Sequence, residues 1–593
     1  MSKIDKSKEA ESKKRLAAKL IQAEKATRLR AIRDRKPFRG LQIKPTASFF
    51  DNATSREPGE ENWTGYGFDI HPQVTFVSVA LLTIFIVLTL MFKEEAAGFF
   101  SQALSTISVN SGWFFILSAN VIVLSCFYFC FSRFGRIKLG GSDAIPEFST
   151  PAWLAMLLSA GMGIGLMFWS VGEPMNHFGS PSPMFSGMKP FTPEAAQAAM
   201  GLTYFHWGLH PWSIYGIVGL GLAFFSFNRG LPLTIRSIFY PLLGEKIYGF
   251  WGNLIDILSV LATLAGLATS LGLGVQQVNA GLNSLFGLAI TPEIQIFLIM
   301  GITGIATLSV MSGLDAGVKF LSGMNMILAG LLMLFLLILG PTVYILSGFT
   351  QNLGYYISQL PRLSFWAETF RDTNWQGAWT IFYWAWWIAW SPFVGMFIAR
   401  ISKGRTVREF LMGVIIVPSL LSFLWMSVFG GTAIFLQASG TADIAGAVKT
   451  NVATALFTLL ESFPFTSVMN MIAIVLVSVF FVTSSDSGSL VVDHLTSGGK
   501  LDSPVPQRVF WATMEGILAG ILLLGGGLQT LQTATICTGL PFACIILISI
   551  YSLYLGLSQE LFVEEAVEAS LKKVEEKHFL DEALNELGED KES

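Results

Sequence analysis

The feature that most constrains the fold is a succession of apolar runs, each long enough to cross a lipid bilayer. A transmembrane helix needs roughly 20 apolar residues, and the chain of 593 residues contains twelve such runs. Charged residues make up 13% of the chain, whereas a soluble domain is about 25% charged. The pattern therefore predicts an all-α membrane protein with twelve transmembrane helices. The runs lie at 74–92, 111–132, 151–172, 197–225, 253–284, 294–312, 320–347, 376–399, 408–434, 466–488, 508–527 and 531–556.

Three polar segments lie outside these runs. Residues 1–71 begin with a strongly basic stretch, which predicts either a solvated tail or a helix that touches anionic lipid. Residues 557–593 are acidic and helix-prone, which predicts a solvated helical tail. Residues 351–370 are amphipathic and too polar to span, so we expect an interfacial helix within 348–375.

The orientation of the spans follows from the Lys and Arg residues of the short loops, which favour the cytoplasmic side. If the N-terminus is inside, the outside loops hold only Lys93, Lys189, Arg362, Arg371 and Lys449. We therefore expect a protein of the cell (inner) membrane with both termini in the cytoplasm. The basic residues of the inside loops are Arg133, Arg136, Lys138, Arg229, Arg236, Lys246, Lys319, Arg400, Lys403, Arg405, Arg408, Lys500 and Arg508.

Two spans carry helix-breaking residues. Gly161, Gly163 and Gly165 alternate in the third span, and each glycine costs a helix about 1 kcal/mol relative to alanine. Glycines at a spacing of two lie on different helical faces, which favours local unwinding over close packing through small residues. In the eighth span Ser391-Pro392 is expected to interrupt the helix, because proline removes a backbone donor and disfavours helix before it.

The third and eighth spans are each the first of five. Spans 3–7 (151–347) and 8–12 (376–556) are then two five-helix repeats, and the odd number of spans inverts the second repeat. Two peripheral helices precede them in 72–150. Broken helices at matching positions of inverted repeats indicate a binding site near the bilayer midplane, as in secondary transporters.

Aromatic residues cluster on two spans. Tyr383, Trp386, Trp387 and Trp390 lie at i, i+3, i+4 and i+7, on one helical face. The fourth span adds aromatic residues around Pro211, which should kink it. Two such faces can form a cage for a quaternary ammonium group, which has no N–H and is attracted to ring faces. Tryptophans of the membrane interface are the alternative, but a mid-span position favours the cage.

Four motifs make a family resemblance specific. The stretches "FYWAWWIAWSPFVGMFIARISKGR", "AGMGIGLMF", "FHWGLHPWSIY" and "VTSSDSGS" resemble those of the betaine/choline/carnitine transporter (BCCT) family, and the resemblance covers Pro72 to Gly556. It implies a leucine-transporter-type fold and a homotrimer. It also implies uptake of compatible solutes driven by sodium or, in some members, by protons or by exchange.

The resemblance also implies site residues. The substrate cage falls on Trp207, Trp212, Tyr215 and Trp387, with Phe382, Trp386 and Trp390 beside it. Backbone N–H groups of the unwound glycine run could receive a substrate carboxylate. One Na⁺ site falls on the carbonyls of Ser159, Met162 and Phe480 and on the hydroxyls of Thr483 and Ser484. A second falls on Thr263 near Trp390 and Phe393, but Leu267 stands where another hydroxyl is expected.

The sequence thus predicts an importer of betaine-type zwitterions, such as glycine betaine or dimethylsulfoniopropionate, coupled to Na⁺. A proton-coupled choline importer or a carnitine-type exchanger on the same fold is the alternative. Choline-moving relatives can carry an acid at the position of Gly165, so choline is expected to be a poor substrate. Membrane lipid and the substrate are the expected partners, and nucleic acid is not.

Several polar residues of the spans have uncertain roles. Glu173 and Asp486 are acids within or near the membrane, and such residues are functional candidates. His206 and His210 lie at i and i+4 without an evident third ligand, so we interpret them as structural. No nucleophile or metal constellation of an enzyme is recognisable, so we expect neither enzyme activity nor a cofactor beyond the coupling Na⁺.

Overall fold

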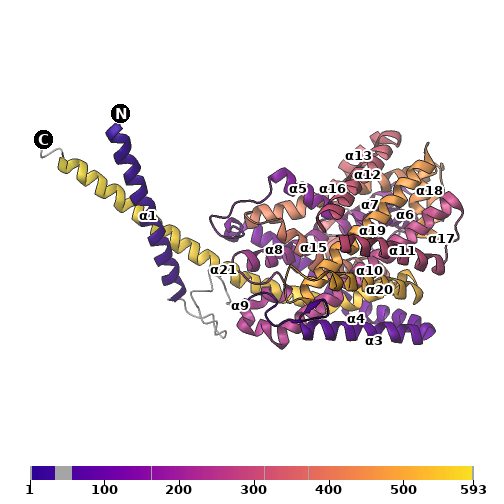
Figure 1. Ribbon diagram of the computed structural model, residues 1–593. Coiled ribbons are helices and arrows are strands. Elements are labelled where there is room, and N and C mark those ends of the chain that lie inside the picture. The colour runs from indigo at the N-terminus through magenta and orange to yellow at the C-terminus, as the bar shows by residue number, and fades with distance from the viewer. Residues whose placement is uncertain (1–2, 34–55, 162, 313, 371–372, 590–593) are drawn as a thin grey trace.

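A computed structural model describes residues 3–33, 56–161, 163–312, 314–370 and 373–589. They form a bundle of long helices from which two helices project at one end (Figure 1). The projecting helices are α1 (Lys3–Arg33) and the C-terminal part of α21 (Leu528–Glu589), so both ends of the chain lie on the same side of the bundle. An even number of spans places the termini in this way.

The bundle confirms the predicted class. Eleven helices are long and apolar enough to span a membrane, and the bent pair formed by α5 (Thr150–Gly161) and α6 (Ile164–Gly179) makes twelve. The other spans are α3 (Pro72–Met91), α4 (Lys93–Phe131), α7 (Pro193–Trp207) continued by α8 (Leu209–Phe227), α10 (Phe250–Phe286), α11 (Pro292–Ser312), α12 (Leu314–Leu339), α15 (Thr380–Arg400), α16 (Val407–Ala438), α19 (Thr466–Thr496), α20 (Val505–Leu524) and α21.

Shorter elements connect the spans. Strands β1 (Trp63–Gly65) and β2 (Phe68–Ile70) pair antiparallel, with Trp63 opposite Ile70. Their two-residue turn has positive φ at both Tyr66 and Gly67, as the tightest hairpins require. The remaining helices are α9 (Tyr240–Leu243), α13 (Thr342–Phe365), α14 (Trp375–Ala378), α17 (Ile444–Thr450) and α18 (Ala455–Leu460), with 3₁₀ turns at Arg133–Arg136, Ile235–Phe239, Gly244–Tyr248 and Val452–Thr454.

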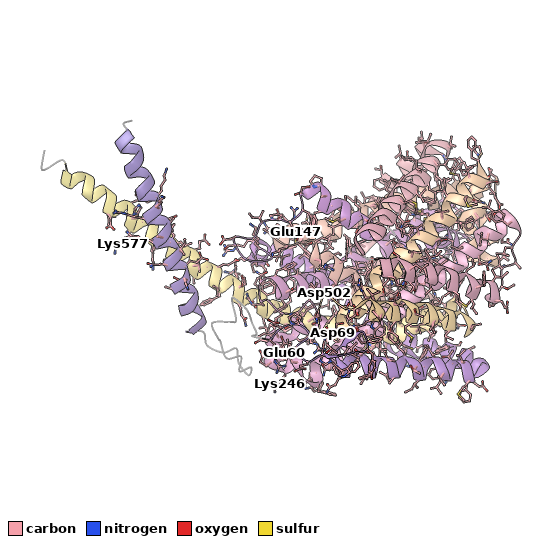
Figure 2. The ribbon with its side chains drawn as sticks, in the orientation of Figure 1. Glu60, Asp69, Glu147, Lys246, Asp502 and Lys577 are labelled. Carbon is pink, nitrogen blue, oxygen red and sulfur yellow. The ribbon has the colours of Figure 1, made fainter. Side chains whose placement is uncertain are left out.

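A hydrogen bond and an ion pair connect the hairpin region to the loop between α19 and α20. Asn62 donates to the carbonyl of Ser497 at 3.0 Å, and Asp69 forms an ion pair with Lys500. Glu60, Asp69, Lys246 and Asp502 lie in the half of the molecule from which the tail helices project (Figure 2). The charged loop residues and the tails therefore share one side of the bundle.

Burial separates inner from outer spans. Of the most apolar stretch of each helix, 94% is buried in α7–α8 and 83% in α15, against 28% in α3 and 22% in α12. Helices α3 and α4 lie along the outside of the bundle (Figure 1). A helix that is apolar all round and buried belongs to the core, and the weakly buried helices present their apolar faces to lipid.

The third span is broken at the glycine run, as predicted. Helix α5 ends at Gly161, α6 begins at Ile164, and the two axes meet at 63°. Gly163 is fully extended, with φ −164° and ψ −179°. Backbone N–H groups at the start of α6 are thereby left without helical partners, as at any helix N-terminus.

The predicted interruption of the eighth span at Ser391-Pro392 is wrong, because α15 runs through both residues to Arg400. Pro392 has no N–H to donate to the carbonyl of Ile388 four residues earlier. The hydroxyl of Ser391 donates to that carbonyl at 2.7 Å instead. One side-chain hydrogen bond thus replaces the missing backbone bond. The fourth span does break, at Gly208, just before Pro211.

The helices of the two predicted repeats pack in a crossed pattern. Helix α8 of the fourth span packs on α15 of the eighth, and α16 of the ninth packs on α5 and α6 of the third. Likewise α10 of the fifth span packs on α20 of the eleventh, and α19 of the tenth packs on α11 of the sixth. Reciprocal contacts of this kind are expected of two units related by an approximate two-fold axis, as in inverted repeats.

Three boundaries differ from the predictions. Helix α12 ends at Leu339, before Gly340-Pro341, so the predicted run 320–347 covers two helices. The amphipathic segment belongs to α13, which starts at Thr342 and ends at Phe365. The acidic tail continues the last span without a break, so that α21 has 62 residues.

The two tail helices are not separate. Helix α1 crosses and contacts the projecting part of α21 (Figure 1). Ser12 of α1 and His578 of α21 are hydrogen-bonded at 3.0 Å. The basic N-terminal tail therefore lies against the acidic C-terminal helix.

Candidate functional site

An aromatic cavity lies between the broken third span, the fourth span and the eighth span. Its volume is about 40 Å³. The predicted residue Phe382 lies outside its lining and stacks on Trp386 with ring centroids 5.4 Å apart. Gly161 is the last residue of α5. The lining residues are Gly163, Gly165, Leu166, Trp207, Pro211, Trp212, Tyr215, Ser270, Trp386, Trp387, Trp390 and Ser422.

The rings of the cavity face one another from three helices, α7, α8 and α15. Trp386 and Trp387 of α15 stack with centroids 4.7 Å apart and planes 12° apart. Trp207 stands nearly perpendicular to both, with its centroid 5.0 Å from that of Trp387. Tyr215 also meets Trp387 edge to face at 6.2 Å. The predicted cage residues therefore lie together around one cavity.

The glycine run sets how closely the backbone approaches these rings. A Cβ on Gly165 would lie 2.6 Å from Cη2 of Trp386 and 3.2 Å from Cη2 of Trp207. A Cβ on Gly163 would meet no atom within 4 Å. Gly165 is thus required by the tryptophans, whereas Gly163 faces open space.

Four of the five tryptophans that line the cavity fall into two sets according to the partner of the indole N–H group. That of Trp207 donates to Oε2 of Glu173 at 2.8 Å, and that of Trp387 donates to the carbonyl of His206 at 3.0 Å. Those of Trp386 and Trp390 are buried and have no hydrogen-bond partner in the described part of the chain. Buried indoles usually find a partner, so these two can serve a polar ligand.

A second cavity, of about 120 Å³, lies on the other side of Trp390. Ser159, Phe480, Thr483 and Ser484, four of the five residues predicted for the first Na⁺ site, line it together. The fifth, Met162, lies outside the described residues. Hydroxyl and carbonyl oxygens are the ligands that hard cations prefer. The other lining residues are Ser322, Asn325, Trp390, Phe393, Val394, Phe397 and Ser487.

Asn325 of α12 is a residue of this cavity that the sequence did not point to. Its Nδ2 donates to the hydroxyl of Thr483 at 3.3 Å. Its Oδ1 is buried without a hydrogen-bond partner among the described residues. A buried acceptor normally has a partner, so Oδ1 is a further candidate oxygen ligand.

The residues suggested for a second Na⁺ do not form a comparable group. The hydroxyl of Thr263 donates to the carbonyl of Ser259 in its own helix at 2.7 Å. Leu267 is fully buried against Gly488. Phe393 lines the cavity of the first site. These contacts are compatible with a single ion site.

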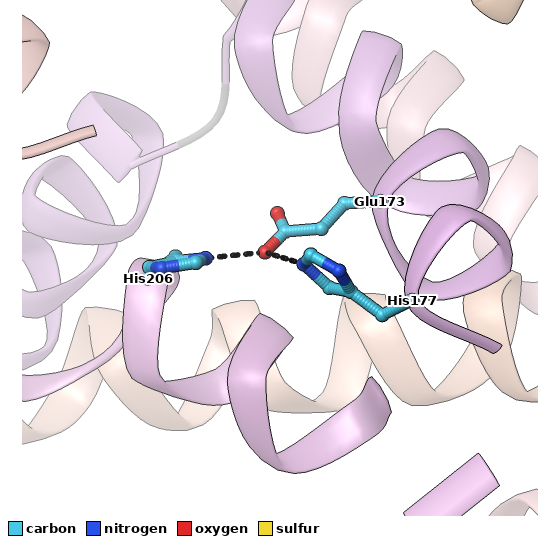
Figure 3. Close-up of side chains that lie close together, drawn as sticks. All are labelled: Glu173, His177 and His206. Carbon is cyan, nitrogen blue, oxygen red and sulfur yellow. Dashed lines mark hydrogen bonds and ion pairs between the residues drawn. The ribbon is translucent and has the colours of Figure 1, made fainter. Parts of the chain in front are cut away.

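Glu173 is the centre of a buried network beside the aromatic cavity. Its Oε1 lies 2.6 Å from Nδ1 of His206 and 3.6 Å from Nε2 of His177, as Figure 3 shows. Its Oε2 accepts hydrogen bonds from the Tyr383 hydroxyl at 2.5 Å and from Trp207. All five side chains are buried. Sequence analysis missed this network, although Glu173 and His177 share a helical face at i and i+4.

The other polar candidates have separate partners. His210 turns away from His206, lying 3.2 Å from Oδ1 of Asn120 and stacking on Trp384. Asp486 accepts a hydrogen bond from Ser309 at 3.0 Å. Both contacts hold neighbouring helices together, which agrees with the structural interpretation of His210.

Comparison with known proteins decides the family. The family model described as BCCT, betaine/carnitine/choline family transporter, matches residues 73–562. The chain belongs to the BCCT family. The match spans every helix that lines the two cavities, so the resemblance of the four sequence motifs is confirmed.

Individual members of the BCCT family are also similar along most of their length. A glycine betaine/proline/choline transporter of Vibrio parahaemolyticus is 48% identical over 84% of this chain and 91% of its own. Glycine betaine transporter 1 of the same organism is 47% identical over 86% and 98%. The glycine betaine transporter OpuD of Bacillus subtilis is 46% identical over 77% and 89%. This BCCT chain is therefore a membrane transporter of the betaine type.

Proposed function

We propose that the protein imports betaine-type compatible solutes by Na⁺ symport with alternating access. The observation that carries the proposal is the pair of cavities that share Trp390, one lined mainly by aromatic rings and the other by five hydroxyl side chains and Asn325 among apolar residues. A zwitterionic onium compound and a sodium ion match these two linings. Because Trp390 lines both cavities, binding of the solute and binding of Na⁺ would be coupled through this side chain.

The aromatic cavity suits the cationic end of such a solute. A quaternary ammonium or tertiary sulfonium group has no N–H and is attracted to π faces, such as those of Trp207, Trp386 and Trp387. The carboxylate end needs donors. Helix N-termini supply free N–H groups and a favourable dipole, and α6 begins at the edge of this cavity, after Gly163.

The coupling ion is assigned to the second cavity. Its oxygen atoms carry no formal charge, which suits a monovalent hard cation. Thr263 does not line this cavity and Leu267 offers no oxygen, so one Na⁺ per transport cycle is proposed.

Uptake into proteoliposomes tests this function. Labelled glycine betaine should accumulate when an inward Na⁺ gradient is imposed, and should not accumulate in K⁺ buffer with a proton gradient. The expected Hill coefficient for Na⁺ is nearer one than two. Accumulation driven equally well by the proton gradient would contradict Na⁺ coupling.

A proton-coupled choline importer, or a carnitine-type exchanger, is the second candidate. Its support is that the 48% identical relative from Vibrio parahaemolyticus is named a glycine betaine/proline/choline transporter. The buried carboxylate of Glu173, bound to Trp207, is also an anion beside the cage. Exchange would be recognised by uptake that requires internal substrate and no ion gradient.

The same proposal includes the membrane, the orientation of the chain and its oligomeric state. The protein is placed in the cell (inner) membrane with α1 and the projecting part of α21 in the cytoplasm, as the loop charges predict. A homotrimer is proposed by family resemblance. Native mass spectrometry of the detergent-solubilised protein checks it, and a monomer as the sole species would contradict it.

A further inference from the structure

Three side chains with metal-binding atoms meet in the Glu173 network. Glu173 and His177 come from α6, and His206 comes from the end of α7. Their exposed fractions are 0%, 1% and 0%. Each offers one ligand atom, and these atoms all lie within 4.8 Å of one another. Figure 3 shows both imidazole rings directed at the same carboxylate oxygen.

His177 has an unexplained position in this group. Neither of its ring nitrogens has a hydrogen-bond partner among the described residues. Its Nε2 lies 3.6 Å from Oε1 of Glu173, which is too long for a hydrogen bond. A buried polar group without a partner costs about 1–3 kcal/mol. A cation between the imidazole and the carboxylate would remove that cost.

The other two ligands are already oriented by neighbours. Tyr383 and Trp207 donate to Oε2 of Glu173, which leaves Oε1 facing the imidazoles. Nε2 of His206 lies 3.0 Å from the Thr380 hydroxyl, which fixes the ring with Nδ1 toward Oε1. Metal-binding histidines are commonly held through their second nitrogen in this way.

We propose that Glu173, His177 and His206 bind a divalent transition-metal ion of the Zn²⁺ class. Imidazole nitrogen favours such ions, whereas Na⁺, Mg²⁺ and Ca²⁺ prefer all-oxygen sites. Neighbouring ligands of tetrahedral Zn²⁺ are roughly 3.3 Å apart, which is close to the 3.6 Å between His177 and Glu173. The 2.6 Å pair of His206 and Glu173 is hydrogen-bonded, so the ion would replace the shared proton and widen this pair. Three protein ligands leave one coordination position open.

The site has a consequence for transport, which rests on the proposed function. A bound ion would tie α6 to α7, the elements that carry Gly165 and Trp207 into the aromatic cavity. A bound ion would oppose any separation of these two helices during the transport cycle. We therefore expect Zn²⁺ to inhibit uptake from a position outside the substrate cage.

Direct binding tests the site without transport. The purified full-length protein is stripped with EDTA, freed of the chelator and titrated with Co²⁺. The visible spectrum should show the strong bands of four- or five-coordinate Co²⁺ at one ion per chain. His177→Phe should weaken this binding by at least about tenfold. Phenylalanine keeps the ring that packs on Trp379 at 4.4 Å and leaves the hydrogen bonds of Glu173 intact.

His494→Phe is the matched control. His494 is as buried as His177, and its nitrogens likewise lack hydrogen-bond partners among the described residues, but it lies on α19 outside the cluster. This variant should bind Co²⁺ like the wild type. A wild-type spectrum that stays that of hydrated Co²⁺, or a His177→Phe variant that binds normally, would overturn the site.

Uptake assays then test the consequence. External Zn²⁺ should inhibit uptake of glycine betaine by the wild type, EDTA should reverse the inhibition, and His177→Phe should resist it. Inhibition that persists in His177→Phe would overturn the assignment of the effect to this site. A wild type that binds Co²⁺ but shows no uptake of any betaine would overturn the proposed function and leave the metal site standing.

Discussion

The indole N–H of Trp207 donates a 2.8 Å hydrogen bond to the carboxylate of Glu173. Trp207 lines the aromatic cavity, so a fully buried negative charge is attached to one of the rings that meet the substrate. The same carboxylate also holds Tyr383 of α15 and His206 of α7. The position of the cage rings is therefore set by a residue that does not line the cavity.

Glu173→Gln is expected to weaken the binding of glycine betaine by roughly tenfold or more. A hydrogen bond to a charged group contributes about 1.5–3 kcal/mol, and the amide retains the shape but not the charge. Tryptophan fluorescence titration in the presence of EDTA measures the affinity. Glu515→Gln, which replaces another fully buried glutamate, on α20, is the control and should bind normally. Equal affinities of both variants and the wild type would contradict a role for Glu173.

Trp387→Ala should lower substrate affinity by about 1–2 kcal/mol, because it removes a ring that both stacks on Trp386 and meets Trp207. Trp425→Ala removes an indole of the same size from α16, where it stacks on Phe429 outside the cavity. Isothermal titration of both purified variants gives the comparison. If Trp387→Ala, correctly folded, binds as well as Trp425→Ala, the cage lies elsewhere.

Gly165→Ala should impair binding although it adds only a methyl group. The new Cβ would lie 2.6 Å from Trp386, so the ring must move, and overpacking of this kind costs about 1–3 kcal/mol. Gly163→Ala adds the same group where no atom lies within 4 Å, and it should lose less affinity. The dissociation constants of the two variants decide the point. A larger loss of affinity in Gly163→Ala would show that the tryptophan rings do not limit how closely the backbone of α6 approaches the cavity.

Replacing both Thr483 and Ser484 with Ala should raise the Na⁺ concentration for half-maximal uptake, because two oxygens of the ion cavity are lost. Ser478→Ala is the control, since it removes a hydroxyl from the same helix that does not line the ion cavity. Uptake is measured over a series of Na⁺ concentrations at constant ionic strength. An unchanged half-maximal concentration in the double variant would place the ion elsewhere.

Glycine betaine should be transported more efficiently than choline. The unwound start of α6 offers N–H groups for a carboxylate, and Gly165 provides no acid to balance a net positive charge. Glu173 acts in the opposite direction, but its Oε2 already accepts two hydrogen bonds, from Trp207 and Tyr383. Uptake of both solutes into the same vesicles measures the ratio, and comparable efficiencies would refute this preference.

Local patterns predicted the parts of the structure that local forces determine. Twelve apolar runs gave the spans, three alternating glycines gave the break of the third span, and the i, i+3, i+4, i+7 spacing from Tyr383 to Trp390 gave one wall of the cage. In each case, all the residues of the pattern lie in one continuous stretch of the chain.

Contacts between distant segments were not predictable in this way. His206 was paired with His210 by spacing, whereas the fold pairs it with Glu173, which is 33 residues away in sequence. Asn325 reaches the ion cavity only because α12 packs on α19. The end of α12 at Leu339 could have been predicted from the local sequence, because Pro341 marks the end of a helix.

The hydrogen bond from Ser391 to the carbonyl of Ile388 gives α15 a mechanical property. Proline leaves this turn with one backbone hydrogen bond fewer than the rest of the helix, and the side-chain bond that replaces it is worth about 1 kcal/mol. This turn directly follows Trp390, the residue common to both cavities. A bend of α15 at this point would therefore strain fewer backbone bonds than a bend elsewhere, and it would displace a side chain that lines both cavities.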